Sequence, residues 1–341
     1  MRVVACVVLA MGCSGSVGNH DDNPDATNGG DGQHGDAPDF SSTGGPYFTS
    51  PMFWNRDVSS AAKASYSNAT ISALRAAGGW GNSDTFQIDF TITVLGADNS
   101  TPMRSFTKTA DFYSPDCDFM QMPVPQTGSV EGETGYACTH DGDCHLLVFQ
   151  KDSGMLYEMW RANITSSTFY GGCLAAWNTH TAYTDSLRGD QCTSADAAGY
   201  PISPLLFTAD EVKAGSIDHA IRFILPNDRV KRGFVRPATH GTSTTGGTNA
   251  PAYGVHLRLR ADYPIESLPS EGAKVVARAL QKYGMYHADG GQIALTAASD
   301  RYTTAKWSGL LGPQDLSALN VEDFEVIDHG GMIPLTLDCV R

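Results

Sequence analysis

The sequence predicts a mainly β protein, folded as a β-sandwich or jelly roll with a few peripheral helices. Short apolar segments recur along the 341 residues and are separated by Gly, Pro, Asn and Asp. One segment alternates strictly between apolar and polar residues, and only three have the periodicity or capping signals of a helix. Many short strands with turn residues between them suit packed sheets. A β-propeller is the alternative, which the lack of a blade-length repeat in the sequence disfavours.

The clearest strand covers residues 86–94, where Phe, Ile and Val at the even positions alternate with polar residues. This period of two is typical of a strand with one buried face. Residues 145–150 and 155–162 flank the turn sequence KDSG and predict a β-hairpin. Further strands are expected at residues 217–225, 233–238, 254–263 and 292–298.

Helices are expected at residues 67–77, 208–215 and 270–284. The first has apolar residues on one side and stops at two consecutive glycines. In the second, Thr208 and Glu211 have the spacing of a capping box, and a Gly follows the last helical residue. The third begins with a Ser cap, and its apolar residues share one face before a closing Gly.

The first forty-six residues differ in composition from the rest of the chain. Residues 1–13 contain Arg2, an apolar run and small residues around Cys13, a pattern that resembles a bacterial lipoprotein signal. An ordinary signal peptide is the alternative. Residues 14–46 are rich in Gly, Asp, Asn, Pro and Ser, so we expect a disordered tether. We expect residues 47–341 to form a single β-rich domain.

The charge of residues 47–341 excludes some classes of partner. This part of the chain has 22 Lys and Arg residues against 31 Asp and Glu residues, a net charge of −9. An acidic balance disfavours a general nucleic-acid-binding surface. No later apolar run approaches membrane-spanning length, so a lipid on Cys13 would be the only membrane anchor. We expect a monomer that is secreted or held at the outer surface as a lipoprotein.

Cysteine usage agrees with export. Residues 47–341 contain six cysteines, which are Cys117, Cys138, Cys144, Cys173, Cys192 and Cys339. An even number in an exported chain predicts three disulfides, whose connectivity the sequence leaves open. Proximity in the sequence favours the pairs Cys138–Cys144, Cys173–Cys192 and Cys117–Cys339.

No metal or cofactor is expected from the motifs. A zinc site with His140 and His145 would crowd its ligands into CTHDGDCH, and the chain has no CxxC pair. Three histidines, His219, His240 and His256, could converge on neighbouring strands, but their spacing does not indicate it. The chain has no P-loop, HExxH helix, GxSxG elbow or dinucleotide-binding GxGxxG.

Four motifs in the second half of the chain point to a family. They are TSADAAG at 193–199, DHAIRF at 218–223, PATH at 237–240 and YGMYHADGG at 283–291. Together they resemble an uncharacterised family of exported bacterial β-rich proteins. The resemblance covers most of residues 47–341 and implies a shared fold, but it implies no reaction.

Carboxylates and imidazoles concentrate between residues 196 and 256. Asp196, Asp218, His219 and His240 are the candidate catalytic residues, and we expect them to border one cleft. Paired carboxylates can act as acid and base, and imidazoles exchange protons near neutral pH. Structural interpretations remain open, because a histidine on an apolar strand face is commonly a core residue and Asp218 could pair with Arg222. Ser in TSAD could be a nucleophile or an ordinary capping residue.

A second group of residues suggests ligand binding. His256, Arg258 and Arg260 lie on one face of an expected strand, where three cations repel unless anionic groups lie opposite. Those anions could be the chain's own carboxylates or an acidic ligand. Arg222 is a further substrate-binding candidate, and so is Trp177, because flat aromatic faces stack on sugar rings.

These observations predict an exported carbohydrate-active enzyme that cleaves an extracellular polysaccharide. The first hypothesis is a glycoside hydrolase in which Asp196 and Asp218 act as acid and as base or nucleophile. The second is a polysaccharide lyase, in which an arginine would neutralise a uronate while a histidine removes the neighbouring proton. The third is a non-catalytic glycan-binding surface lipoprotein. A polysaccharide is the expected partner in all three.

Overall fold

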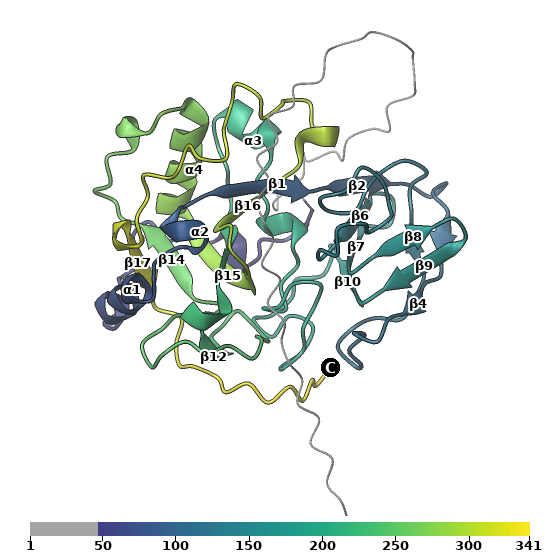
Figure 1. The fold of residues 1–341 in the computed structure, drawn as a ribbon, viewed down its shortest axis with the longest axis horizontal. Helices are drawn as coiled ribbons and strands as arrows, with labels where there is room; N and C mark the ends of the chain where they lie inside the picture. The colour runs from purple at the N-terminus through teal and green to yellow at the C-terminus, as the bar shows by residue number, and fades with distance from the viewer. Residues whose placement is uncertain (1–46) are drawn as a thin grey trace, which may run out of the picture. The chain divides into compact units, whose positions relative to one another are not determined.

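Strands dominate the part of the chain that the structure describes, as Figure 1 shows. The computed structural model describes residues 47–341, and the expected signal at 1–13 and tether at 14–46 lie outside the described residues. The strands form one six-stranded sheet, one four-stranded sheet and three small sheets, and no sheet closes into a barrel. The prediction of a mainly β, sandwich-like fold with few helices is confirmed.

The larger sheet has the strand order β1-β16-β11-β15-β14-β17. Its strands are β1 (Ile88–Ile92), β16 (Leu295–Ala298), β11 (Ile221–Leu225), β15 (Met285–Gly290), β14 (His256–Leu259) and β17 (Phe324–Ile327). The pairs β1–β16 and β11–β15 are parallel, whereas β14 is antiparallel to both of its neighbours. The sequence indicated several of these strands but not their pairing, and β15 and β17 were not expected.

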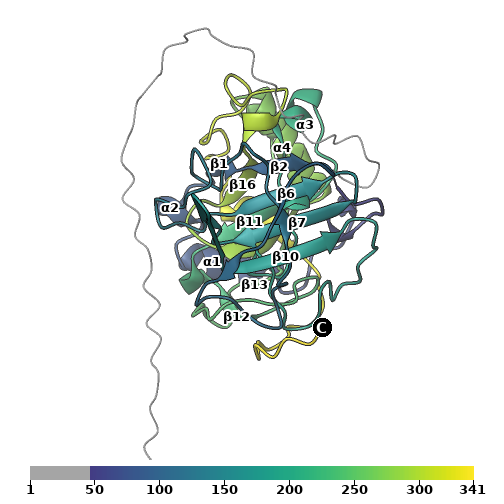
Figure 2. The ribbon, with the colours of Figure 1, turned by 90° about the vertical axis from the view of Figure 1, so that its right-hand side faces the viewer.

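The four-stranded sheet has the order β10-β7-β6-β2, with β10 (Cys173–Asn178), β7 (Met155–Trp160), β6 (Leu146–Gln150) and β2 (Val94–Ala97). Strands β6 and β7 form the predicted antiparallel hairpin, in which Gly154 has a φ of 63° that favours glycine. Only Thr93 separates β1 from β2, so one extended segment contributes to both large sheets. Figure 2 shows β6, β7 and β10 in front of β11 and β16.

The small sheets complete the strand inventory. They pair β12 (Lys231–Phe234) with β13 (Ala252–Tyr253), β3 (Met103–Arg104) with β5 (Met122–Pro123), and β9 (Thr168–Gly171) with both β4 (Thr107–Lys108) and β8 (Asn163–Thr165). Strand β14 is shorter than the expected strand at residues 254–263. The expected strand at residues 217–225 begins only at Ile221, so the prediction is wrong for residues 217–220, which precede β11.

The three predicted helices are present as α1 (Ser67–Ala76), α3 (Ala209–Ala214) and α4 (Glu271–Lys282), and a short α2 covers Gly81–Asp84. In α3 the capping box of Thr208 and Glu211 forms as predicted. In α4 the Ser270 hydroxyl accepts a hydrogen bond from the Ala273 amide at 3.2 Å. Helix α4 packs against β14, and α1 packs against β17. Among residues 47–341, no helix has the length and apolarity to cross a bilayer.

Six 3-10 turns lie in the described residues, at Phe53–Asn55, Ser203–Leu205, Asn227–Arg229, Ile265–Ser267, Asp300–Tyr302 and Val321–Asp323. The core has two hydrophobic clusters that meet at the four-stranded sheet. Leu147 and Leu156 belong to the larger cluster, whereas Leu146 and Tyr157 on the same two strands belong to the smaller one. This sheet is therefore buried on both faces, because its side chains alternate between the two clusters.

The structure contains the three expected disulfides, which are Cys117–Cys173, Cys138–Cys144 and Cys192–Cys339. The favoured pair Cys138–Cys144 is confirmed, but the favoured pairs Cys173–Cys192 and Cys117–Cys339 are wrong. Strand β10 runs beside the segment that contains Cys117, where the Asp118 amide donates to the Leu174 carbonyl. The C-terminal segment pairs with Asp190 through Val340, which brings Cys339 to Cys192. Disulfides of this number are typical of an oxidising environment outside the cytoplasm.

Candidate functional site

A pocket with a volume of about 230 Å³ lies where the two large sheets meet. Its walls come from β7 and β10 of the smaller sheet, from the end of β15 in the larger sheet, and from the loops 193–197 and 240–242. The polar and aromatic residues that line it are Tyr113, Asp143, Trp160, Thr193, Ser194, Asn227, His240, Thr242, Tyr253 and Asp289. Since these residues are far apart in the sequence, only the fold assembles them.

Asp289 is the most perturbed acid in this pocket. It lies near the end of β15, with its side chain 25% exposed. Burial raises its pKa well above the usual value, and the charges of Asp196 and Asp143 raise it further. Arg222 opposes this shift, but its guanidinium is 4.0 Å from the Asp289 carboxylate and is directed mainly to Asp196. The direction of this pKa shift favours the protonated form, which is the form that a general acid needs.

Asp143 provides a second carboxylate on the same pocket. It lies within the loop closed by the Cys138–Cys144 disulfide and is exposed, and its Oδ1 accepts a hydrogen bond of 2.9 Å from the Trp160 indole nitrogen. Trp160 is the last residue of β7, so the hairpin fixes both the ring and the carboxylate. The pocket thus combines an acid whose pKa is raised with a second carboxylate that is close enough to contribute to this shift.

His240 adds an imidazole to this group. Its Nδ1 donates to the Ala197 carbonyl at 2.9 Å, which leaves Nε2 as the nitrogen that can accept a proton. Burial lowers the pKa of His240, so the ring is neutral at pH 7. The hydroxyl of Tyr253, another lining residue, is 3.0 Å from Thr242 Oγ1. These contacts orient the polar side of the pocket.

A buried network of charges lies beside the pocket. Arg222 donates to both carboxylate oxygens of Asp196, at 2.8 and 3.3 Å, and to the Thr296 hydroxyl at 3.0 Å. His145 lies 2.6 Å from Glu131 and donates from Nε2 to the Ala195 carbonyl. Burial alone would lower the pKa of His145, but the Glu131 carboxylate raises it to about 10. Both pairs therefore hold the loop 193–197 that forms one wall of the pocket.

The structure brings only part of the sequence-predicted catalytic group to this site. His240 lines the pocket, and Asp196 lies next to it but is fully buried in its ion pair with Arg222. Asp218 is exposed in the loop before β11 and does not pair with Arg222, contrary to the structural alternative. His219 is buried, and its Nε2 is 3.2 Å from Glu211 in α3, so it joins that helix to the sheet.

The substrate-binding candidates are also satisfied within the fold, so the expected basic stripe is not a free surface. Arg258 pairs with Glu325 directly across from it on β17, and Arg260 pairs with Asp262. His256 donates to the Tyr283 carbonyl and stacks on Tyr286, and burial lowers its pKa to about 4. Arg222 is the buried partner of Asp196 described above.

Trp177 and Ser194 have structural partners as well. Trp177 is fully buried and donates to Glu158, so it belongs to the core and offers no face to a sugar. The hydroxyl of Ser194 donates to the Tyr200 carbonyl at 2.6 Å and accepts from the Asp196 amide. Although Ser194 lines the pocket, these bonds make it the capping residue that the TSAD sequence suggested.

Sequence reasoning missed the two pocket acids. Asp143 is part of CTHDGDCH, whose pattern suggests zinc ligands, and Asp289 is part of YGMYHADGG, which contributes to the family resemblance. Neither residue lies in the 196–256 interval where carboxylates and imidazoles concentrate. The sequence signal for both residues is an Asp next to a Gly in a short motif, and this pattern does not reveal that the side chain faces a pocket.

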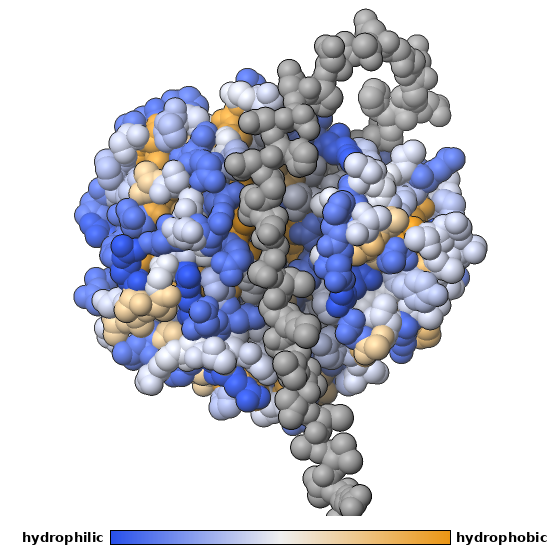
Figure 3. All heavy atoms as spheres, viewed as in Figure 1, coloured by the Kyte–Doolittle hydropathy of each residue, from blue (hydrophilic) through white to orange (hydrophobic). Residues whose placement is uncertain are grey.

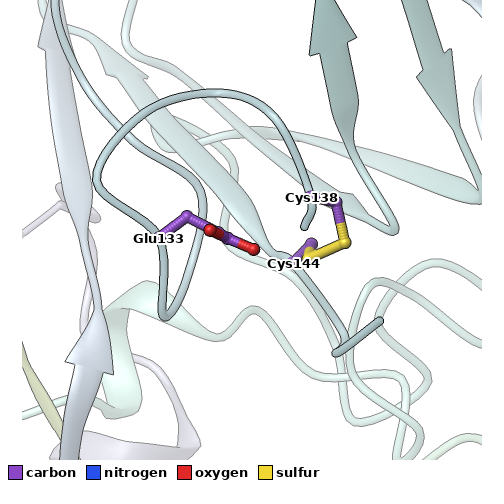
Figure 4. A group of neighbouring side chains, drawn as sticks. All are labelled: Glu133, Cys138 and Cys144. Atoms are coloured by element: carbon purple, nitrogen blue, oxygen red, sulfur yellow. A yellow bond between two sulfur atoms is a disulfide. The ribbon is translucent and has the colours of Figure 1, made fainter. Parts of the chain in front are cut away.

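The cysteines of the zinc hypothesis, Cys138 and Cys144, form a disulfide. Figure 4 shows the Glu133 carboxylate beside Cys138 and Cys144, whose sulfurs are joined. The three groups are close enough to hold a metal ion only if the cysteines were thiolates. Glu133 instead accepts hydrogen bonds from the amides of Thr139 and His140, at 2.5 and 3.0 Å. His145 is committed to Glu131.

Comparison with family models, curated proteins and solved structures finds no match to this chain. The resemblance to the exported family therefore stays a prediction.

Proposed function

We propose that the protein is an exported glycoside hydrolase, with Asp289 as the general acid and Asp143 as the base or nucleophile. The observation that carries this proposal is that two carboxyl groups, Asp143 and Asp289, line one pocket, and that burial and acidic neighbours raise the pKa of Asp289. Glycosidic cleavage needs such a division of roles, because one carboxyl protonates the leaving oxygen while the other acts at the anomeric carbon.

The remaining lining supports a carbohydrate substrate. Trp160, Tyr113 and Tyr253 supply aromatic rings with polar tips, and Asn227 and Thr242 supply hydrogen-bonding groups of the kind that sugar hydroxyls use. His240 would orient a hydroxyl group or a water molecule through Nε2.

The two other hypotheses have less support. A lyase for uronate polymers needs a cation against the substrate carboxylate, and no Arg or Lys is among the described residues that line the pocket. A purely binding site would not need an acid with a strongly raised pKa. Three disulfides are compatible with a secreted protein, and a lipid on Cys13 would convert it to a surface lipoprotein.

The proposal is tested by screening the wild-type protein against neutral and acidic polysaccharides, with released reducing ends and unsaturated products measured together. Asp289→Asn and Asp143→Asn should each lower turnover by about 10²–10⁴-fold, because each removes a proton-transfer group. Asp218→Asn is the matched control, since it removes an exposed carboxylate outside the pocket and should keep full activity. Unsaturated products, or full activity of Asp289→Asn, would reject the assignment.

The pH profile provides an independent test. The general acid must be protonated, so turnover should fall as the pH rises through the pKa of Asp289, which is raised well above that of an ordinary Asp. An activity that is lost only below pH 4 would contradict this role.

A further inference from the structure

An exposed aromatic surface lies next to the pocket. Tyr113 is 54% exposed and Phe119 is 62% exposed. The partly buried Phe112 precedes Tyr113 in the sequence, and its ring centroid is 6.1 Å from that of Phe119. We call Phe112, Tyr113 and Phe119 the aromatic ridge, in which Phe112 and Phe119 are in ring contact and Tyr113 also lines the pocket. The face of the molecule in Figure 3 is mainly hydrophilic, with small apolar patches.

Two rings of the ridge, Phe112 and Phe119, pack against neighbouring side chains. Phe119 packs its edge against Phe106, with ring centroids 5.3 Å apart and planes at 89°. The Lys108 ammonium lies 4.1 Å from the Phe112 ring centroid and 4.3 Å from that of Phe119. Binding to rings that are already ordered loses little conformational entropy.

The backbone of the ridge is anchored to the four-stranded sheet. Cys117 forms a disulfide with Cys173 at the start of β10. The adjacent Asp118 accepts a hydrogen bond of 2.8 Å from the Ala176 amide and pairs with Arg188 at 2.7 Å. The exposed rings are therefore a stable feature of the surface and do not belong to a loose loop.

The ridge is continuous with the pocket. Tyr113 belongs to both, and Cys173, which anchors the ridge, also lines the pocket. Arg161 connects them further, because it pairs with Asp111 at 3.3 Å and lies over the Trp160 ring. The pocket itself, at about 230 Å³, is smaller than the roughly 300–1,000 Å³ usual for small-molecule sites. A chain of sugar units bound there must extend beyond it.

We propose that the aromatic ridge binds the sugar units of a glycan polymer that extend out of the pocket, so that the substrate is a polymer and not a free oligosaccharide. This inference rests on the proposed function, according to which the pocket binds a glycan. Pyranose rings present apolar C–H faces that pack on exposed aromatic rings, and Tyr113 and Phe119 offer two such rings beside the pocket.

The experiment uses Asp289→Asn in the full chain, which keeps the pocket and ridge intact. Its migration is measured in native gels that contain xylan, laminarin, soluble starch, glycol chitin or polygalacturonate. We expect retardation by at least one of these polymers. Adding Tyr113→Ala and Phe119→Ala should weaken that binding at least about tenfold. Adding Tyr66→Ala should not, because Tyr66 is an exposed tyrosine at the N-cap of α1 that does not line the pocket.

Kinetics on the active protein separates the ridge from the catalytic proposal. Phe119→Ala should raise KM for the polymer about tenfold and leave the hydrolysis of a short aryl glycoside unchanged. Phe119→Tyr should restore the polymer KM, because it keeps the stacking face. Cleavage of polymer with no effect of the ridge variants overturns the ridge and leaves the proposed function standing. Retardation that depends on the ridge, without any cleavage, supports the ridge and overturns the proposed function. Neither cleavage nor retardation overturns both.

Discussion

The pocket and strand β14 contain the same kinds of side chain but differ in how those side chains are partnered. On β14, Arg258 faces Glu325 across the strand pair, and His256 is stacked and hydrogen-bonded in the interior. In the pocket, Asp289 stays partly exposed and is left 4.0 Å from an arginine that binds another acid. Charged residues alone therefore do not identify a site; the pocket differs because its titratable group, Asp289, has no ion-pair partner of its own among the described residues and keeps an exposed face.

The buried pair beside the pocket is expected to give the largest effect of any substitution in this comparison. Arg222→Met would leave Asp196 buried without its partner, which costs about 3–5 kcal/mol of unfolding free energy. Chemical denaturation of the wild-type protein and of Arg222→Met measures this difference in unfolding free energy. The double variant Arg222→Met/Asp196→Leu should recover much of the loss, because it removes both charges. A single variant within 0.5 kcal/mol of wild type, roughly the effect of a neutral surface change, would contradict a buried pair.

The pair of His145 and Glu131 predicts a pH-dependent stability. The folded pKa of His145 is raised to about 10 from an ordinary 6.5, so its contribution is complete below pH 6.5 and is lost as the pH rises through 10. The unfolding free energy should fall by up to about 1.4 kcal/mol per pH unit within this window. Denaturation of wild type and His145→Gln at several pH values measures this. Equal slopes for the two proteins would show that His145 is neutral in the fold.

Asp289 should make the unfolding free energy depend on pH in the opposite direction to an ordinary ion-paired acid. Its folded pKa is raised, so the folded state retains a proton that the unfolded state releases, and stability declines as the pH rises above the usual Asp range. Asp289→Asn removes this decline. At pH 7 the variant should be at least as stable as wild type, within about 1 kcal/mol. A clear loss of melting temperature would indicate that Asp289 is a structural ion-pair member.

The smallest change in unfolding free energy is expected for a substitution just beyond β14. Arg260 is about half exposed and pairs with Asp262 in solvent, so Arg260→Ala should cost no more than about 1 kcal/mol. Arg258→Ala should cost more, because Arg258 is buried and also donates to the Val58 and Ala61 carbonyls. Neither should change activity on any polymer. A selective loss of polymer binding in Arg260→Ala would restore the basic stripe as a ligand surface.

The sequence by itself determined the local elements of this protein. Helices α3 and α4, the β6–β7 hairpin and the Cys138–Cys144 disulfide depend on caps, turns and periodicity within a few consecutive residues, and all of them formed as predicted. The number of disulfides also followed from counting cysteines. These features are readable because the residues that stabilise them are neighbours in the chain.

Tertiary structure decided the sheet order, the other two disulfides and the candidate site. The parallel pairing of β11 with β15 brings Asp289 close to Arg222, and the hairpin of the other sheet brings Asp143 to the same pocket. Asp143 and Asp289 are 146 positions apart, and no local pattern encodes which carboxylate keeps an exposed face and which is neutralised by an arginine. That outcome depends on burial and on the partners available in space, which exist only once the two sheets have packed together.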